Sequence, residues 1–507
     1  MNGDEGVFDI VVVGTGLTES ITAAALAKAG FKVAHLDENP HYGASEASLS
    51  FDELVTWQSA PRPGFSHFSR SSDTIPQPRA YSLSLSPSLI PSTGPLIDAL
   101  VASGVSRYGG FRLLERVCLY HPSGIAKPVP GSKEDVFKSK EISLVEKRRL
   151  MRFLQFAAGE FEDKKDLEGH KDTPFPEYLR SVFSLNEEIT TAIVYALAYC
   201  LTPKDATLPA LHRLRRYLRS SGRYGASPFL IGHYGSSGEI AQGFCRTAAV
   251  SGGVYILGRR IETIDSSDQE KHIIRLEEFP EPISCSLLIS RSAPGISPVP
   301  PSSEPSSPFS VSSPSLTVAR CIAIVDAPIL FNPPVEQSED TDSPPPPTPS
   351  DTGVIVFPPS SLPAGGSATA SANALIVGEG TMSCPRGKWL IHLSLPLVED
   401  IDDADPRTLL EPYLNATLGL AAAPLVPLFA TYYLQHPTPS SETNKTEGMK
   451  LAPTPLPPIL PLPDAGDAAA VHAQDLFWAA VKAMGQESEV AAFWPPSEGQ
   501  DDGNDGD

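Results

Sequence analysis

Cysteine is scarce in this chain, with six residues among 507. They lie far apart along the sequence, at Cys118, Cys200, Cys245, Cys285, Cys321 and Cys384. No two are spaced like the ligands of a zinc site or the cysteines of a small disulfide-bonded domain. The chain opens on a strand-like run, without the basic and apolar regions of a secretory signal. We therefore expect reduced thiols, no metal site and a cytoplasmic protein.

Basic residues are also few, since 39 Lys and Arg face 60 Asp and Glu, which gives a formal net charge of −21. This balance argues against nucleic acid as a partner, because no basic surface is available to replace phosphate counterions. Long apolar runs are missing too. The two longest, near 189–201 and 419–434, are too short or too interrupted by proline to cross a bilayer. Any membrane contact is therefore expected to be peripheral and transient.

Proline, in contrast, is abundant, with 52 residues. Much of it falls in two Pro/Ser-rich tracts, 293–315 and 333–349, whose composition cannot build a packed core. We expect both tracts to be disordered insertions. The acidic tail, 496–507, is expected to be mobile as well. A chain of this length still has room for two or more hydrophobic cores outside these segments.

The first strongly patterned stretch is a strand, a helix and a second strand. The β-branched run Phe8–Val13 is typical of a buried parallel strand. Gly14 and Gly16 follow it, and an alanine-rich helix then leads to a second strand that ends before Asp37. This order is the dinucleotide-binding layout. Glu19 replaces the third glycine of the fingerprint and would set a carboxylate beside a bound pyrophosphate. FAD or NAD binding is the alternative, but we favour a retained fold with vestigial glycines and no cofactor.

An aromatic residue follows the second strand. The turn Asp37–Gly43 displays Tyr42 at the carboxyl end of that strand. Ligand crevices of open α/β sheets lie at this edge. Tyr42 is therefore either a packing residue or part of a binding surface.

From residue 143 to 217 the pattern becomes all-helical. The predicted helices are 144–161, 175–184, 187–201 and 208–220, and they are inserted between strand-rich parts of the chain. The sequence thus predicts an α/β fold, in which an FAD-binding-like, Rossmann-type βαβ domain with mixed β-sheets carries a small inserted α-helical domain. Domain I comprises 1–120 together with 221–495, and domain II comprises 121–220. The apolar faces of domain II either form a core alone or open to hold a lipid chain.

The first of these helices has an aromatic residue in an unexpected place. Its core stripe is Leu150, Phe153, Leu154 and Ala157. Phe156 lies about 100° from the centre of that stripe, beside Arg149 and Arg152. It is therefore either covered by another part of the chain or is an anchor for a partner protein.

A turn-rich segment, 232–238, leads into another helix at Glu239. An acidic residue in a first turn suits the positive end of the helix dipole. At 3.6 residues per turn, Glu239, Gln242 and Arg246 share one face of this helix. The alternatives are a solvated polar face and one half of a surface that Tyr42 completes.

Four stretches together carry a family resemblance. Phe8–Glu19 and Asp37–Gly43 look like the start of the Rab GDP-dissociation-inhibitor and Rab-escort superfamily, and Arg223–Gly253 resembles its second Rab-contacting block. The stretch Pro130–Phe156 is similar to the Rab escort branch in particular. Escort proteins are the accessory component A of Rab geranylgeranyltransferase. The resemblance therefore implies a non-catalytic protein without cofactor or metal, which binds GDP-bound, unprenylated Rab GTPases and presents them to the catalytic heterodimer.

The resemblance also implies roles for individual residues. Tyr42, Glu239, Gln242 and Arg246 match the family's Rab-binding surface, and Phe156 with Arg152 matches the transferase-binding position. Domain II corresponds to the part of the family that shelters the geranylgeranyl groups, after which the lipidated Rab is delivered to membranes. Ala44 and His41 depart from the family's usual residues around Gly43. The rival functions are a Rab GDP-dissociation inhibitor and a flavin-dependent oxidoreductase on the same fold.

Overall fold

The computed structural model describes residues 6–129, 142–268, 271–291, 297–298, 317–331, 348–398, 404–437, 450–453, 456–457 and 460–495. The predicted acidic tail, 496–507, lies outside these residues, as does most of the two Pro/Ser-rich tracts. The exceptions are residues 297–298 and 348–349, which form the short strands β15 (Ser297–Pro298) and β18 (Thr348–Pro349) rather than irregular chain.

The dinucleotide-binding layout is present as expected. Strand β1 (Val7–Val13) lies parallel to β2 (Val33–Asp37) and β14 (Ile283–Ile289), and β11 (Val254–Leu257) extends the sheet beyond β2. The sheet continues through the antiparallel strands β13 (Lys271–Leu276) and β12 (Ile261–Asp268). Mixed strand directions in one sheet fit the predicted fold class.

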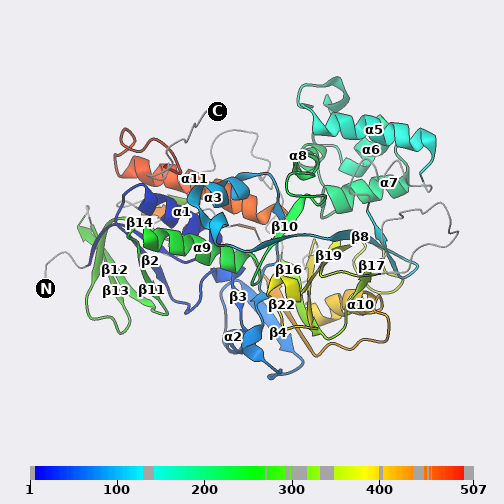
Figure 1. The fold of residues 1–507 in the computed structure, drawn as a ribbon. Helices are drawn as coiled ribbons and strands as arrows, with labels where there is room; N and C mark the ends of the chain where they lie inside the picture. Colours follow the sequence, from blue (N-terminus) through cyan, green and yellow to red (C-terminus); the bar gives the residue numbers. More distant parts are fainter. Residues whose placement is uncertain are drawn as a thin grey trace, which may run out of the picture.

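The helix α1 (Leu17–Lys28) is the centre of the layer that covers this sheet (Figure 1). Residues 17–27 of α1 are all buried, because α9 (Ser237–Val250) and α11 (Ala465–Ala483) pack against it and α3 (Pro95–Ser103) lies beside α11. The run Ala23–Ala27 makes this possible, since small side chains let neighbouring helices approach closely. The first core is therefore sealed by helices from three distant parts of the chain.

A second sheet carries the helical domain on one face. Its order is β4 (Phe65–Arg70), β22 (Phe429–Gln435), β16 (Val318–Val325), β21 (Trp389–Pro396), β20 (Ala372–Gly378), β19 (Thr352–Phe357), β8 (Arg116–His121) and β9 (Ile125–Pro128). All residues of β16 are buried because both faces are covered. Cys321 and Ala323 face a core that includes the helix α10 (Pro406–Leu418), whereas Ile322 and Ile324 face the core shared with the helical domain (Figure 1).

The helical domain consists of α5 (Leu144–Ala158), α6 (Phe175–Phe183), α7 (Glu187–Thr191) with its π-helical continuation (Ala192–Leu197), and α8 (Thr207–Ser220). These elements match the four predicted helices within a few residues. The predicted start of domain II at residue 121 falls within the β8–β9 hairpin, which belongs to the second sheet. Among the helices in the described ranges, none has the length and apolar character that crossing a membrane requires.

Phe156 corrects the predicted core stripe of α5. Its side chain is only 7% exposed and packs against Phe161 and Phe183, with ring centroids 5.8 and 5.3 Å away. Leu154, which was expected in the stripe, is only partly buried. The segment after α5 and the end of α6 widen the buried side of the helix toward Phe156, so the ring is covered by the chain itself.

A bridge of buried charges joins the helical domain to α11. Arg216 of α8 contacts Asp464 and, at 3.0 Å, Asp467. Asp467 also accepts a hydrogen bond from the backbone N–H of Leu96 at the start of α3 (3.0 Å). Burial raises the pKa of Asp467 to about 6, although Arg216 and the Leu96 N–H oppose this shift. Three elements of the two domains thus meet at one carboxylate.

Stability is expected to depend on pH through His392, which lies on β21 and is 3% exposed. Burial, aided by the charge of Arg320, lowers the pKa of His392 to about 4. The unfolded chain therefore takes up this proton near pH 6.5, whereas the folded chain resists it, so stability is lost as the pH falls from 6.5 toward 4. Between pH 7.5 and pH 5 the loss from this one residue is about 2 kcal/mol. Urea denaturation of wild type and His392→Gln at both pH values measures it, and an equal pH dependence in the two proteins would contradict the expectation.

Candidate functional site

The helix α9 begins in a tightly packed turn. Strand β10 (Phe229–Gly232) leads into it from a three-stranded sheet with β6 (Ile90–Pro91) and β7 (Phe111–Leu113). A Cβ on Gly238 would lie 2.4 Å from the backbone nitrogen of Ser48, so only glycine fits at this point of the helix. The close approach presses the first turn of α9 against the loop that follows β2.

The three predicted residues of α9 do share one face. Glu239 is partly buried, whereas Gln242 and Arg246 are exposed. The opposite face, with Ile240, Phe244 and Ala248, is buried in the first core. Because the Glu239 carboxylate is partly removed from water, burial raises its pKa.

Tyr108 is a member of this surface that the sequence did not reveal. The guanidinium of Arg246 lies 5.0 Å from the centroid of the Tyr108 ring, within the range of a cation–π contact. The Tyr108 hydroxyl donates a hydrogen bond to the Gly243 carbonyl (2.9 Å) and lies 2.7 Å from the hydroxyl of Thr247. An exposed aromatic side chain is thus fixed along α9, although it comes from a segment about 140 residues earlier in the chain.

Tyr42 lies on the loop beside the start of α9. Its ring packs edge-on against Tyr255 of β11, with 6.0 Å between centroids, and burial raises its pKa. Gly43 has a φ of +99°, and a Cβ there would lie 2.9 Å from the Cα of Ala47 and 3.2 Å from that of Gly238. The loop can therefore touch α9 only because residue 43 is glycine. Tyr42 is therefore partly buried, with one side of its ring packed on Tyr255.

We call Tyr42, Tyr108, Glu239, Gln242 and Arg246 the platform. Together they offer two aromatic rings, a carboxylate, an amide and a guanidinium on helix and loop positions held by packed backbone. Aromatic and arginine side chains dominate the binding energy of protein interfaces. Among the residues with assigned structure, no three His, Cys, Asp or Glu side chains are grouped as metal ligands. The platform has the chemistry of a surface for protein recognition.

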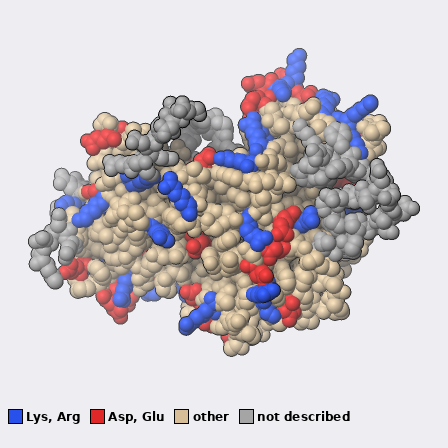
Figure 2. All heavy atoms as spheres, in the orientation of Figure 1, with Lys and Arg blue, Asp and Glu red and all other residues tan. Residues whose placement is uncertain are grey.

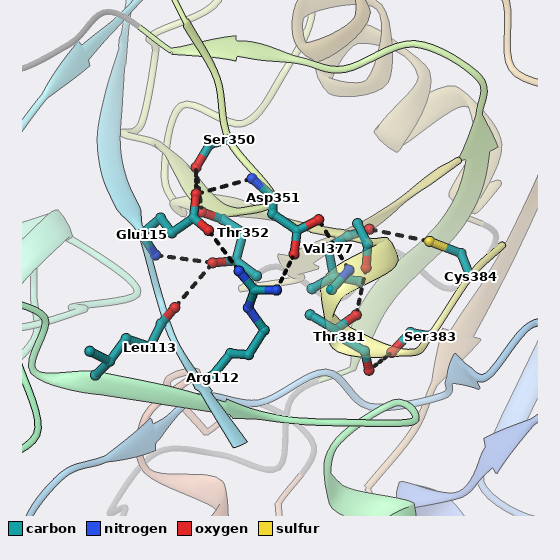
Figure 3. A network of polar contacts seen from close by, with 12 residues as sticks. Arg112, Leu113, Glu115, Ser350, Asp351, Thr352, Val377, Thr381, Ser383 and Cys384 are labelled. Atoms are coloured by element: carbon teal, nitrogen blue, oxygen red, sulfur yellow. Dashed lines mark hydrogen bonds and ion pairs between the residues drawn. The ribbon is translucent and has the colours of Figure 1, made fainter. Parts of the chain in front are cut away.

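A network of polar contacts connects β7 to the turn after β20, which contacts the segment before α9 (Figure 3). Arg112 of β7 contacts Asp351 at 3.2 Å and Glu115 at 3.3 Å, and the N–H of Gly380 donates to Asp351 at 3.3 Å. This ties the turn 378–384, at the end of β20, to β7. The same turn also accepts two hydrogen bonds from the segment that precedes α9. The N–H of Tyr234 donates to the Thr381 carbonyl (3.0 Å), and the N–H of Gly235 donates to the Ser383 hydroxyl (3.1 Å). The second sheet thereby positions the first turn of α9, the helix that carries Glu239, Gln242 and Arg246.

The chain's own carboxylates line the inner wall of the dinucleotide crevice. Glu19 is 3% exposed and pairs with Arg291, with 2.6 Å between Oε1 and Nε. Its Oε2 lies 2.6 Å from where a Cβ of Gly16 would be, directly over the glycine turn. The backbone N–H of Leu17, at the start of α1, donates a hydrogen bond to Glu46 (3.2 Å). An anionic pyrophosphate belongs at such a helix N-terminus, and two carboxylates there repel it. These residues do not fit FAD or NAD.

Arg152 and Phe156, the predicted transferase-binding pair, lie on neighbouring turns of α5 but differ in exposure. Arg152 is exposed and pairs with Asp166 at 3.3 Å, while its guanidinium lies 5.3 Å from the centroid of the Phe183 ring. Phe156 lies beneath, against the same Phe183 ring. In Figure 2, Lys and Arg side chains along this lobe are interspersed with acidic ones rather than gathered into one basic face.

The sequence of this chain is similar to those of several curated proteins. A protein of Drosophila melanogaster named Rab proteins geranylgeranyltransferase component A is 37% identical over 288 residues, covering 52% of this chain and 55% of the relative. Rab GDP dissociation inhibitor beta of Canis lupus familiaris is 32% identical over 289 residues, covering 56% of this chain and 62% of the relative. The chain thus spans about half to three fifths of the length of these curated relatives.

Solved structures support the fold. A Rab GDI from Plasmodium falciparum superposes with a TM-score of 0.64 at 20% identity, covering 93% of this chain and 97% of that one. An oxidoreductase from Methanosarcina mazei gives a TM-score of 0.53 at 15% identity, covering 84% and 87%. The predicted α/β, FAD-binding-like fold is confirmed. The family described as GDP dissociation inhibitor matches residues 1–341, so this chain belongs to the GDP dissociation inhibitor family.

Proposed function

We propose that this protein is a Rab escort protein. In this role it binds GDP-bound, unprenylated Rab GTPases, presents them to the catalytic heterodimer of Rab geranylgeranyltransferase and delivers the geranylgeranylated Rab to membranes. The observation that carries the proposal is the platform, in which close packing at Gly43 and Gly238 sets the Tyr42 loop against the start of α9 and hydrogen bonds fix Tyr108 along the same helix. Family membership and the component A relatives support the same function.

A second binding face follows from α5. Arg152 is exposed beside the buried ring of Phe156. Its helix, α5, lies in the helical domain, away from α9, which carries the platform (Figure 1). One chain can then hold the GTPase on the platform and the transferase on α5 at the same time. Such tethering raises the effective concentration of the GTPase tail at the transferase without requiring that the tail's sequence be read. We propose that Arg152 and Phe156 together form the transferase contact, with Arg152 exposed and the ring of Phe156 beneath it.

The chain itself performs no chemistry in this proposal. The helical domain shelters the geranylgeranyl groups between its helices, where each buried methylene contributes about 0.8 kcal/mol. Phe153, Phe175 and Tyr178 form its fully buried aromatic centre, which offers an apolar surround of the required kind. In this role the protein would act in the cytoplasm, with only transient, peripheral contact with membranes.

A Rab GDP-dissociation inhibitor is the second candidate, since the inhibitor relative is 32% identical over a similar length. It would extract lipidated Rabs without supporting their prenylation. A flavin-dependent oxidoreductase is the third, but the carboxylates of Glu19 and Glu46 oppose a bound cofactor at α1. The inhibitor and escort functions differ in one step, the support of prenyl transfer, and that step decides between them.

Reconstituted prenylation tests the proposal. Catalytic heterodimer, GDP-loaded unlipidated Rab and labelled geranylgeranyl diphosphate are mixed with and without this protein. We expect label to enter Rab only when the protein is present. Label that stays out of Rab, while the protein still binds geranylgeranylated Rab, would leave the inhibitor as the function.

The α5 face is tested in the same reaction. Arg152→Ala is expected to lower the affinity for the heterodimer about tenfold while the affinity for Rab is unchanged, as for an exposed arginine at an interface. Arg148→Ala, an exposed arginine one turn earlier on α5, is the matched control. Phe156→Ala is less suitable, because loss of a ring that is 7% exposed would leave a cavity and destabilise the domain.

A further inference from the structure

A cavity remains where the dinucleotide-binding layout would hold a cofactor. It has a volume of about 380 Å³ and lies at the carboxyl ends of β1 and β2. Its charged lining residues are Glu19, Asp37, Glu38, Glu46, Arg259, Arg260 and Arg291. Glu19 is buried, and its Oε2 has no hydrogen-bond partner. The cavity is thus large enough for a small ligand, but its inner wall carries carboxylates.

The carboxylate of Glu46 lies at the N-terminus of α1, where a bound anion would be expected. The first N–H groups of a helix lack partners within the helix and attract anions. Here the N–H of Leu17, the first residue of α1, donates to Glu46 Oε2 at 3.2 Å. Glu46 Oε1 accepts a second hydrogen bond from the hydroxyl of Ser45. Burial and the nearby charge of Glu19 raise the pKa of Glu46, while Ser45, Arg291 and the Leu17 N–H oppose this shift. The carboxylate therefore has hydrogen-bond donors on both oxygens and sits at the position of a phosphate.

This carboxylate also anchors the loop that carries Tyr42. Glu46 belongs to the short 3₁₀-helix Ala44–Glu46, directly after Tyr42 and Gly43. At the other end of the loop, the N–H of Gly43 donates to the carbonyl of Thr15 (3.0 Å) and lies 3.1 Å from its hydroxyl. The loop is therefore fixed to the glycine turn at Thr15 and to the helix at Leu17. Without the second attachment, the loop would lose its link to the N-terminus of α1, and the Gly43 hydrogen bonds and the Tyr42–Tyr255 ring contact would remain.

We propose that the Glu46 carboxylate is an internal substitute for the phosphate of a dinucleotide, and that it acts as a positioning residue by holding the Tyr42 loop against α1. Glu19 completes the substitution by keeping Arg291, a cation of the cavity lining, engaged in an ion pair. The cavity retains a site for a nucleoside diphosphate that these two carboxylates close. The consequence for partner binding rests on the proposed function, whereas the closure of the cavity does not.

Binding of ADP to the full chain, measured by isothermal titration calorimetry, tests the closure. The double variant Glu19→Ala/Glu46→Ala is expected to bind ADP at least tenfold more tightly than wild type, because the N-terminus of α1 and Arg291 become available together. Glu38→Ala is the matched control, since it removes an exposed carboxylate from the rim of the same cavity. A folded double variant with the ADP affinity of wild type would overturn the proposal. If the double variant does not fold, Glu46→Gln decides, because it keeps the side-chain volume and removes one charge; an unchanged ADP affinity then also overturns it.

Hydrogen exchange tests the positioning role without any partner. In Glu46→Ala, the amides of Leu17 and Gly43 are expected to exchange at least tenfold faster than in wild type, and exchange rates equal to those of wild type would refute the anchor. The affinity for GDP-loaded Rab should fall in the same variant, although Glu46 is not part of the platform. If wild type itself binds no Rab, the proposed function fails while the ADP and exchange results still stand. If wild type binds Rab and Glu46→Ala binds it equally well, the positioning role fails.

Discussion

Replacing Arg246 by alanine is expected to weaken binding of GDP-loaded Rab about ten- to a hundredfold. Arg246 is exposed on α9 and lies 5.0 Å from the Tyr108 ring centroid, which preorders a long side chain before any partner arrives. A preordered arginine loses less conformational freedom on binding, and its charge can pair with an acidic group of the partner. The predicted loss corresponds to about 1.4 to 2.8 kcal/mol of binding free energy. Titration calorimetry with GDP-loaded Rab measures it.

Two further variants test whether the loss of affinity is specific to Arg246. Arg275→Ala removes an exposed arginine from β13, outside the platform, and is expected to leave the affinity unchanged. Tyr108→Phe keeps the ring under Arg246 and removes only the hydroxyl that bonds to Gly243, so its effect should be smaller than that of Arg246→Ala. Equal affinities of wild type and Arg246→Ala would return this face of α9 to an ordinary solvated surface.

Asp467→Ala is expected to lower the free energy of unfolding by about 3 kcal/mol. The carboxylate is fully buried and serves two donors, Arg216 of α8 and the Leu96 N–H of α3. Alanine would leave the Leu96 N–H without its acceptor and remove one of the carboxylates that neutralise Arg216. Denaturation in urea, followed by fluorescence and circular dichroism, measures the loss.

Asp467→Asn separates charge from hydrogen bonding. The amide keeps the volume and can still accept a hydrogen bond, so we expect it to be less destabilising than alanine. Gln474→Ala, at an exposed position of α11, is the control and should be nearly neutral. If Asp467→Ala is as stable as wild type, the junction between the helical domain and α11 does not depend on this carboxylate.

Local patterns were sufficient to predict much of the fold. The β-branched run before Gly14 and the apolar periodicity from residue 144 to 220 each identify an element from its own residues, and the structure has both elements in place. The predicted core stripe of α5 was wrong in leaving out Phe156, and the reason lies outside that helix. A helical wheel shows which residues share a face, but it cannot show that Phe161 and Phe183 extend the buried side of α5 toward Phe156.

The platform could be predicted only where its residues carry a motif. Glu239, Gln242 and Arg246 share a helix, so periodicity alone groups them. Tyr108 meets them through tertiary packing, and nothing in the turn after α3 indicates that its ring lies beside Arg246. Glu46 is a similar case. Its contact with Leu17 closes a loop of 29 residues, and a glutamate next to a serine in a turn has no signal of its own.

The packing of α11 on α1 has a consequence for how the chain folds. The hydroxyl of Thr22 reaches the carbonyl of Ala473 across 451 residues of sequence, and Ala469, Ala473 and Phe477 share a core with Ile21 and Ala24. During synthesis the apolar side of α1 is therefore made long before its cover. Contacts of such high sequence separation form slowly, and until they form the uncovered apolar surface of α1 is exposed to aggregation. Chaperone protection of the first βαβ unit would have to last until α11 has emerged.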